Sequence, residues 1–211
     1  MIEQLVPATV TTVATRGDLH TRLSPAELRA LGDAVQSRRR EFETGRACAR
    51  DALARLGLPA ASVAGGARGE PLWPRGVVGS ITHCDRYRAC AVARAEDVRS
   101  VGIDAEVHAP LRAGILEAIA GDDERRALAA HGGGVCWDRL LFSAKEAVYK
   151  ACYPLTGRGM GFEDVDVRID PGRFSFHARL LVEHAGVPAE LPGRWGVAGG
   201  IVATAVVVGR S

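Results

Sequence analysis

Hydrophobic residues in the first part of this chain recur with a strand-like period and then with a helical one. Residues 4–15 are rich in valine and threonine, which predicts one or two strands. Apolar side chains over residues 28–56 keep helical spacing up to Gly57, and a break near Gly32 divides this region into two predicted helices. The first helix opens with residues 24–27 (SPAE), which supply an N-cap serine, an N1 proline and an N3 glutamate, the signature of a capping box.

The middle of the chain loses the helical period and regains periodicity as strands. Residues 60–79 are rich in glycine and proline, which predicts a loop. Apolar residues at 89–94 and 99–104 are separated by a polar turn at 95–97. This pattern predicts two neighbouring strands.

The last part of the chain returns to helices and then to strands. Helical spacing predicts helices over residues 111–130 and 137–152, the second ended by Pro154, and β-rich segments predict strands over 163–169, 173–182 and 195–208. Helices and a few antiparallel strands therefore occur twice along the chain. We expect an α+β fold made of two similar halves, residues 1–107 and 108–211.

Composition narrows the class of protein. The chain has 211 residues, 47% of them hydrophobic and 25% charged, with a net charge of +2, which gives no reason to expect nucleic acid or a membrane as partner. Its five cysteines form no C-x-x-C pair, so neither a thiolate metal site nor a disulfide framework is predicted. The start of the chain has no secretory signal, and the longest apolar run, residues 197–208, is too short to cross a bilayer. We expect a cytoplasmic protein.

The positive charge is distributed unevenly. Lysine occurs only twice, as Lys145 and Lys150 within the stretch 142–150 (FSAKEAVYK), and the other 25 basic residues are arginine. An ammonium is a compact charge, whereas a guanidinium is a wide planar fork, so a crowded site beside a phosphate and a metal favours lysine. Six arginines lie on one predicted helix, which is either a solvated face or half of an anion site: Arg38, Arg39, Arg40, Arg46, Arg50 and Arg55.

Two carboxylates follow a predicted buried strand. Asp104 and Glu106 lie on the same face, because side chains alternate along a strand. Oxygen ligands without histidine or cysteine favour Mg²⁺ or Mn²⁺ over zinc. A solvated strand end is the alternative for any isolated D-x-E pair.

The lysine-containing helix carries a third carboxylate. Glu146 and Lys150 are four residues apart and share a face, while Lys145 projects to one side of it. A surface ion pair worth about 0.3–0.5 kcal/mol would explain them. The rest of this helix is apolar, however, and charges on a mostly buried helix need partners, which a metal and a phosphate would supply.

A further polar segment, residues 79–83 (GSITH), predicts a turn before a strand. Its two hydroxyls and its imidazole suit phosphate oxygens, although a Ser/Thr turn with one histidine is common.

Taken together, these segments resemble the signature blocks of a known family. The strand 101–106 (VGIDAE), the helix 142–150 and the segment 79–83 are similar to those of the Sfp/EntD-type 4′-phosphopantetheinyl transferases. Residues 46–50 (RACAR) and 69–74 (GEPLWP) resemble further blocks of the EntD-like branch with its actinobacterial members. The resemblance runs from about residue 36 to the C-terminus, and three motifs in the same order are far more specific than one.

The resemblance implies a pseudo-dimeric α+β fold with coenzyme A and Mg²⁺ in the cleft between two halves. It implies Asp104, Glu106 and Glu146 as metal ligands, and Glu146, Lys145 and Asp104 as the catalytic group. Coenzyme A would be contacted by Asp104, Lys145, Glu146 and Lys150, with Lys145 at the pyrophosphate. Its other implied contacts are Ser80, Thr82 and His83 at the adenosine phosphates, Arg38 and Arg46 at the 3′-phosphate, and Arg68, Glu70 and Pro71 at the adenine. Arg68 replaces a lysine that relatives often carry shortly before Gly69.

The implied reaction moves phosphopantetheine from coenzyme A to a serine of an apo acyl or peptidyl carrier protein and releases adenosine 3′,5′-bisphosphate. Such carriers serve polyketide, nonribosomal peptide and siderophore synthesis, and the arginine-rich helix could steer an acidic carrier. We expect a monomer, because two similar halves already form the interface. Two other functions fit some of the residues. A metal-dependent nuclease would favour the order Glu-x-Lys and a broad basic surface, and a non-catalytic binding module would need no metal.

Overall fold

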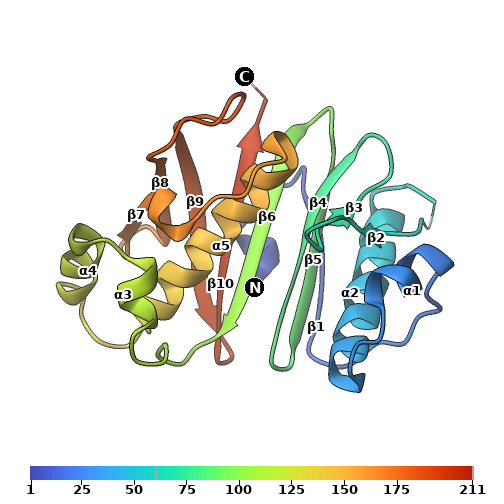
Figure 1. The fold of residues 1–211 in the computed structure, drawn as a ribbon, viewed down its shortest axis with the longest axis horizontal. Coiled ribbons are helices and arrows are strands. Elements are labelled where there is room, and N and C mark those ends of the chain that lie inside the picture. Colours follow the sequence, from blue (N-terminus) through green and yellow to red (C-terminus); the bar gives the residue numbers. More distant parts are fainter. Residues whose placement is uncertain (60, 211) are drawn as a thin grey trace.

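Two α+β units lie side by side in the computed structural model, which describes residues 1–59 and 61–210 (Figure 1). Each unit packs one twenty-residue helix against an antiparallel sheet, α2 (Gln36–Arg55) in the first and α5 (Trp137–Thr156) in the second. The predicted α+β class is confirmed. Within the described residues, none of the helices combines the length and the apolar character needed to span a membrane.

The first unit is built around a three-stranded sheet in the order β1-β5-β4. Its elements are η1 (Ile2–Gln4), β1 (Thr11–Thr15), α1 (Pro25–Leu31), α2, a small hairpin of β2 (Ala64–Gly65) and β3 (Pro71–Leu72), β4 (Val77–Cys84) and β5 (Tyr87–Arg94). The hairpin lies within the predicted loop 60–79, of which residue 60 is outside the described part of the chain. The predicted turn at 79–83 is wrong: these residues belong to β4, which pairs with β5 along its whole length.

The second unit is built around a five-stranded sheet in the order β6-β10-β9-β8-β7. Its elements are β6 (Val98–Val107), α3 (Ile115–Ile119), α4 (Asp122–Ala129), α5, η2 (Phe162–Asp164), β7 (Val165–Asp170), β8 (Ser175–Leu180), β9 (Glu190–Ala198) and β10 (Ile201–Gly209). β6 hydrogen-bonds to β10 throughout and so belongs to this sheet. A division of the chain at residue 107 stays a prediction.

Three predicted boundaries in this unit differ from the structure. The helix expected over 111–130 is two short helices, and the strand expected over 195–208 is a hairpin that turns at Gly199 and Gly200, both with positive φ. Pro154 does not end α5, which continues to Thr156 and stops at the left-handed Gly157. A proline in the last turn of a helix removes only one hydrogen bond, so the glycine decides where the helix ends.

The two sheets meet through side chains rather than through a backbone ladder. β4 and β6 are the facing edge strands, and the hydroxyl of Ser80 accepts a hydrogen bond from the Ile103 amide at 3.1 Å. The hydroxyl of Thr82 accepts one from the Ala105 amide at 3.0 Å. These two hydroxyl-to-amide bonds form the seam between the units.

Gly102 allows α5 to lie directly on β6. A Cβ at this position would collide with the carbonyl oxygen of Ala147 and the amide of Ala151. The absence of a side chain therefore brings the polar residues of α5 next to those of β6. Gly102 thus allows polar residues of β6 and α5 to line one site.

The capping box predicted at the start of α1 is confirmed, and it has a second function. Ser24 accepts a hydrogen bond from the Glu27 amide, while the fully buried Glu27 carboxylate accepts from the Ser24 amide at 2.7 Å. It also accepts from Arg50 Nη2 at 2.6 Å and from the Val63 amide at 3.0 Å. Glu27 therefore ties α1, α2 and the following loop together.

These contacts predict a pH-dependent stability. Burial raises the pKa of Glu27, but the amides of Ser24 and Val63 and the charge of Arg50 outweigh it, so the pKa falls below its ordinary value of 4.5. A carboxyl whose pKa is lowered on folding stabilises the fold above the unfolded-state pKa, and this contribution disappears as the pH falls through the folded-state pKa. We expect Glu27→Gln to reduce the unfolding free energy by about 1.5–3 kcal/mol at pH 7, and the difference to shrink below pH 4.5. Urea unfolding of both proteins across this range measures it, and a difference independent of pH would contradict this role.

Candidate active site

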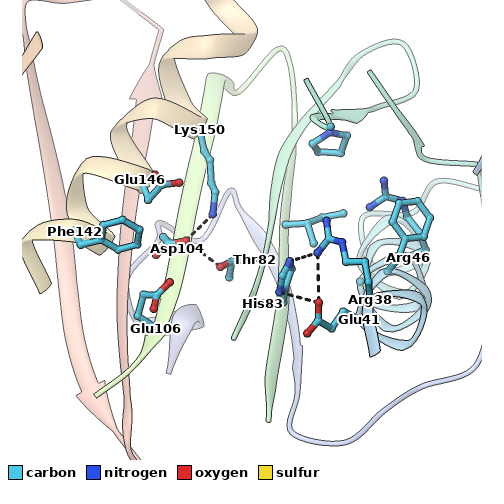
Figure 2. A pocket seen from close by; sticks show the side chains of 15 residues that line it. Arg38, Glu41, Arg46, Thr82, His83, Asp104, Glu106, Phe142, Glu146 and Lys150 are labelled. Atoms are coloured by element: carbon cyan, nitrogen blue, oxygen red, sulfur yellow. Dashed lines mark hydrogen bonds and ion pairs between the residues drawn. The ribbon is translucent and has the colours of Figure 1, made fainter. Parts of the chain in front are cut away.

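A cavity of about 340 Å³ opens between the two units. One wall comes from β6 and α5 and carries Asp104, Glu106, Glu146 and Lys150, as Figure 2 shows. The opposite wall comes from α2 and β4 and carries Arg38, Glu41, Arg46 and His83. The cavity therefore presents carboxylates and an ammonium on one side, and mostly cationic or imidazole groups on the other.

Asp104 is the best-positioned carboxylate of the first wall. It is buried, and its Oδ1 accepts from Lys150 Nζ at 2.6 Å and from the Thr82 hydroxyl at 3.2 Å. Its Oδ2 is buried without a hydrogen-bond partner among the described residues. Burying a carboxylate oxygen without a hydrogen-bond partner costs free energy. Such an oxygen is expected where it coordinates a cation.

Glu106 is held by a residue that lies outside the sequence motifs described above. Arg139, from α5, donates to Glu106 Oε2 at 3.0 Å and to the carbonyl oxygens of Ala109 and Pro110 at 3.0 and 3.2 Å. Burial raises the pKa of Glu106, and the nearby charge of Asp104 raises it further, while Arg139 lowers it. Arg139 precedes Glu146 by seven residues, two helical turns, and this spacing is the signal that could have identified it.

Glu146 faces the cavity without an assigned partner. Within residues 1–59 and 61–210 its carboxylate makes no side-chain hydrogen bond, and it lies near Lys150 on the same face of α5 (Figure 2). Burial raises its pKa, with Lys150 acting in the opposite direction. A carboxylate with a raised pKa that faces a cavity is suited to accept a proton.

Arg46 is the most buried cation of the opposite wall. Its residue exposure is 5%, its guanidinium stacks 4.0 Å from the ring centroid of Phe42, and its Nε has no hydrogen-bond partner among the described residues. Burial lowers the pKa of Arg46 to about 10. A buried guanidinium with an unused donor beside a cavity favours an anionic ligand.

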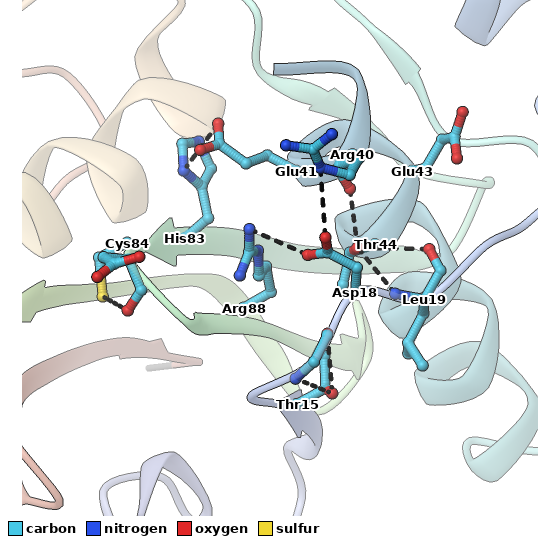
Figure 3. A network of polar contacts seen from close by, with 12 residues as sticks. Thr15, Asp18, Leu19, Arg40, Glu41, Glu43, Thr44, His83, Cys84 and Arg88 are labelled. Carbon is cyan, nitrogen blue, oxygen red and sulfur yellow. Dashed lines mark hydrogen bonds and ion pairs between the residues drawn. The ribbon is translucent and has the colours of Figure 1, made fainter. Parts of the chain in front are cut away.

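Arg38 and His83 form a second group on this wall. Arg38 Nη1 donates to His83 Nε2 at 2.6 Å, and Glu41 Oε2 lies 3.4 Å from the same Arg38 nitrogen. Desolvation lowers the pKa of His83, and Arg38 lowers it further, while Glu41 acts in the opposite direction. Not all the arginines of α2 serve this cavity: Arg40 pairs with Asp18, which also pairs with Arg88 (Figure 3).

Lys145 lies outside the cavity, contrary to the expectation that it contacts the pyrophosphate. It is 3% exposed, and its ammonium donates to the carbonyl of Ile119 at 2.7 Å, to Glu124 at 2.8 Å and to the carbonyl of Phe162 at 2.9 Å. Glu124 also accepts from the amides of Gly121 and Val167. All three donors of Lys145 are used in a buried cluster, so the ammonium that faces the cavity is that of Lys150.

Ser80 and Thr82 also differ from expectation. Both are buried, and strand alternation turns their hydroxyls toward β6, where they form the seam described above. Thr82 does reach the cavity, but it acts there by orienting Asp104. His83, on the other face of β4, remains at the cavity as predicted.

The loop residues expected at the adenine divide between two hollows. Pro71 lines both the cavity and an adjoining groove of about 590 Å³, as Lys150 does, whereas Arg68 and Glu70 line only the groove. The side chain of Glu70 accepts a hydrogen bond from the Arg68 amide at 2.9 Å.

The predicted metal ligands line one cavity but are not gathered into a ready-made cage. Across the described residues, no group of three His, Cys, Asp or Glu side chains is arranged to hold a metal ion. Two of the three carboxylates are instead paired with cations, Asp104 with Lys150 and Glu106 with Arg139. The donor chemistry fits Mg²⁺ or Mn²⁺, since the free atom of Asp104 is a hard oxygen.

Fold and cavity together define an α+β enzyme of two units, with carboxylates and cations converging between them. The first unit matches the 4′-phosphopantetheinyl transferase N-terminal domain over residues 26–93, and the second matches the 4′-phosphopantetheinyl transferase superfamily over residues 100–188. The chain is 48% identical to the 4′-phosphopantetheinyl transferase Svp of Streptomyces mobaraensis, covering 88% of this chain and 78% of that protein. It is 44% identical to Npt of Nocardia iowensis, covering 98% and 99%, and 46% identical to PptT of Mycobacterium tuberculosis, covering 87% and 85%.

The chain belongs to the 4′-phosphopantetheinyl transferase superfamily. A more distant relative is the enterobactin synthase component D of Salmonella typhi, 36% identical over 57% of this chain and 51% of that protein. The family resemblance found in the sequence motifs is confirmed.

Proposed function

We propose that this protein transfers 4′-phosphopantetheine from coenzyme A to a serine of an acyl or peptidyl carrier protein and releases adenosine 3′,5′-bisphosphate. The observation that carries the proposal is the cavity between the units. It sets Asp104, Glu146 and Lys150 opposite Arg38 and Arg46, in a chain 44–48% identical to proteins named for this transfer.

The cationic wall is suited to the nucleotide end of coenzyme A. We assign the 3′-phosphate to Arg38, Arg46 and His83, because the unused Nε of Arg46 is buried beside the cavity. Pro71 and the neighbouring Arg68 and Glu70 would lie at the adenine. Lys150 would contact the pyrophosphate, since its side chain is 27% exposed and lines the cavity.

The carboxylate wall is suited to a divalent cation. We assign Mg²⁺, or Mn²⁺, to Asp104, Glu106 and Glu146, with the partnerless Oδ2 of Asp104 as the leading ligand. The cation, when bound, would supply positive charge that neutralises the leaving group. Lys150 would then be free to turn from Asp104 toward a phosphate.

The chemical step follows from the position of Glu146. Glu146, directly or through water, takes the proton of the carrier serine, whose oxygen forms a bond to the phosphorus that bears pantetheine. The bond from this phosphorus to the bridging oxygen breaks, and adenosine 3′,5′-bisphosphate leaves with that oxygen. Lys150 stabilises the negative charge that develops there. We propose further that the protein acts as a monomer in the cytoplasm and needs no nucleic acid.

Intact mass of a carrier protein tests the reaction. An apo carrier incubated with this protein, coenzyme A and Mg²⁺ is expected to gain about 340 Da, and EDTA is expected to abolish the gain. A gain that persists with EDTA would contradict the metal assignment. Coenzyme A binding without any gain on several unrelated carriers would indicate a binding module instead of a transferase.

A further inference from the structure

Glu41 is a carboxylate on the wall formed by α2 and β4, whose other charged residues are suited to bind an anion. It projects from α2 into the same cavity, and its Oε2 lies 3.4 Å from Arg38 Nη1 and 3.6 Å from His83 Nδ1. Figure 2 shows the three side chains pointing toward one another. A negative charge at this position opposes the binding of any phosphate on this wall.

The tautomer of His83 follows from its contact with Arg38. A guanidinium can only donate hydrogen bonds, so His83 Nε2 is the acceptor of the 2.6 Å contact. The proton of the neutral ring is therefore on Nδ1, the atom that faces Glu41. Arg38 Nη1 and His83 Nδ1 thus both lie within 3.6 Å of a single carboxylate oxygen, a position that a phosphate oxygen could take.

We propose that Glu41 is an internal counter-ion. It occupies the anion position beside Arg38 and His83 when coenzyme A is not bound, and it moves aside when the 3′-phosphate of coenzyme A binds. The inference rests on the proposed function, which assigns that phosphate to Arg38, Arg46 and His83. Displacing Glu41 costs the ion pairs it makes, and this cost is subtracted from the affinity for every ligand that carries the phosphate. A ligand without the 3′-phosphate leaves Glu41 in place.

Glu41→Gln tests the inference because it predicts tighter binding, not weaker. We expect the variant to bind coenzyme A and adenosine 3′,5′-bisphosphate about fivefold more tightly than the wild type, by calorimetry at low salt. The affinity for 3′-dephospho-coenzyme A is expected to change by less than about twofold. Thermal unfolding confirms that the variant is folded.

Glu43→Gln is the matched control on the same helix. It removes the same charge, but Glu43 pairs with His20 at 3.4 Å and points away from the cavity (Figure 3). Equal tightening by both variants, or equal tightening toward 3′-dephospho-coenzyme A, would overturn the inference. Weaker coenzyme A binding by Glu41→Gln would also overturn it, because Glu41 would then be a ligand contact. The wild type could modify a carrier protein while Glu41→Gln leaves the coenzyme A affinity unchanged. This result would contradict the inference about Glu41 but would leave the proposed function intact.

Discussion

The Glu146→Gln variant is expected to transfer phosphopantetheine about 10²- to 10⁴-fold more slowly than the wild type while still binding coenzyme A. The amide keeps the size of the side chain but cannot accept the serine proton. It also weakens the carboxylate set proposed for the cation. Coenzyme A binding is expected to persist because the cations of the opposite wall, Arg38 and Arg46, are unchanged.

Rates of carrier modification by intact mass and coenzyme A affinity by calorimetry separate the two effects. Glu96→Gln is the control, since Glu96 is exposed in the turn between β5 and β6. Near-normal turnover by Glu146→Gln would exclude this residue as the base. If the variant lost both coenzyme A binding and turnover, Glu146 would be assigned to coenzyme A binding.

The second large effect is expected at Lys145, where the consequence is a loss of stability. The side chains of Lys145 and Glu124 are 2% and 3% exposed, and their pair joins α4 to α5. Lys145→Met would leave the Glu124 carboxylate buried without its counter-ion, which typically costs about 3–5 kcal/mol. Urea unfolding measures this loss, and Lys145→Met with Glu124→Gln is expected to recover part of it, because the uncompensated charge is then gone.

Arg126→Met is the matched control for Lys145. Arg126 pairs with Asp123 on α4, but its side chain is 74% exposed, so the change is expected to cost less than about 1 kcal/mol. If Lys145→Met kept wild-type stability and lost only activity, the result would instead support the pyrophosphate contact that the family resemblance implies for Lys145.

The two lysines illustrate what the sequence could and could not predict. Helical spacing correctly placed Glu146 and Lys150 on one face and Lys145 to its side. Spacing alone does not reveal that α3, α4 and η2 close over Lys145, because those contacts join residues 17 to 26 positions apart in the sequence. Assigning Lys145 by family resemblance therefore gave the phosphate role to the lysine that the fold buries.

The other differences have the same origin. Residues 79–83 contain glycine and serine, which favour a turn locally, but pairing with β5 makes them a strand. Asp104 and Glu106 were predicted from strand alternation, which is local and reliable. Arg139 was missed because its partner is 33 residues away in the sequence.

The seam between β4 and β6 has a consequence for the separated units. Each of these strands is the edge of its own sheet, and an uncovered edge strand offers unpaired amides to any other chain. In the intact protein each edge shields the other, with Ser80 and Thr82 satisfying the amides of Ile103 and Ala105. If the two units were separated, each would expose an unpaired edge strand that could pair with other chains. The covalent link between the units therefore also protects against aggregation.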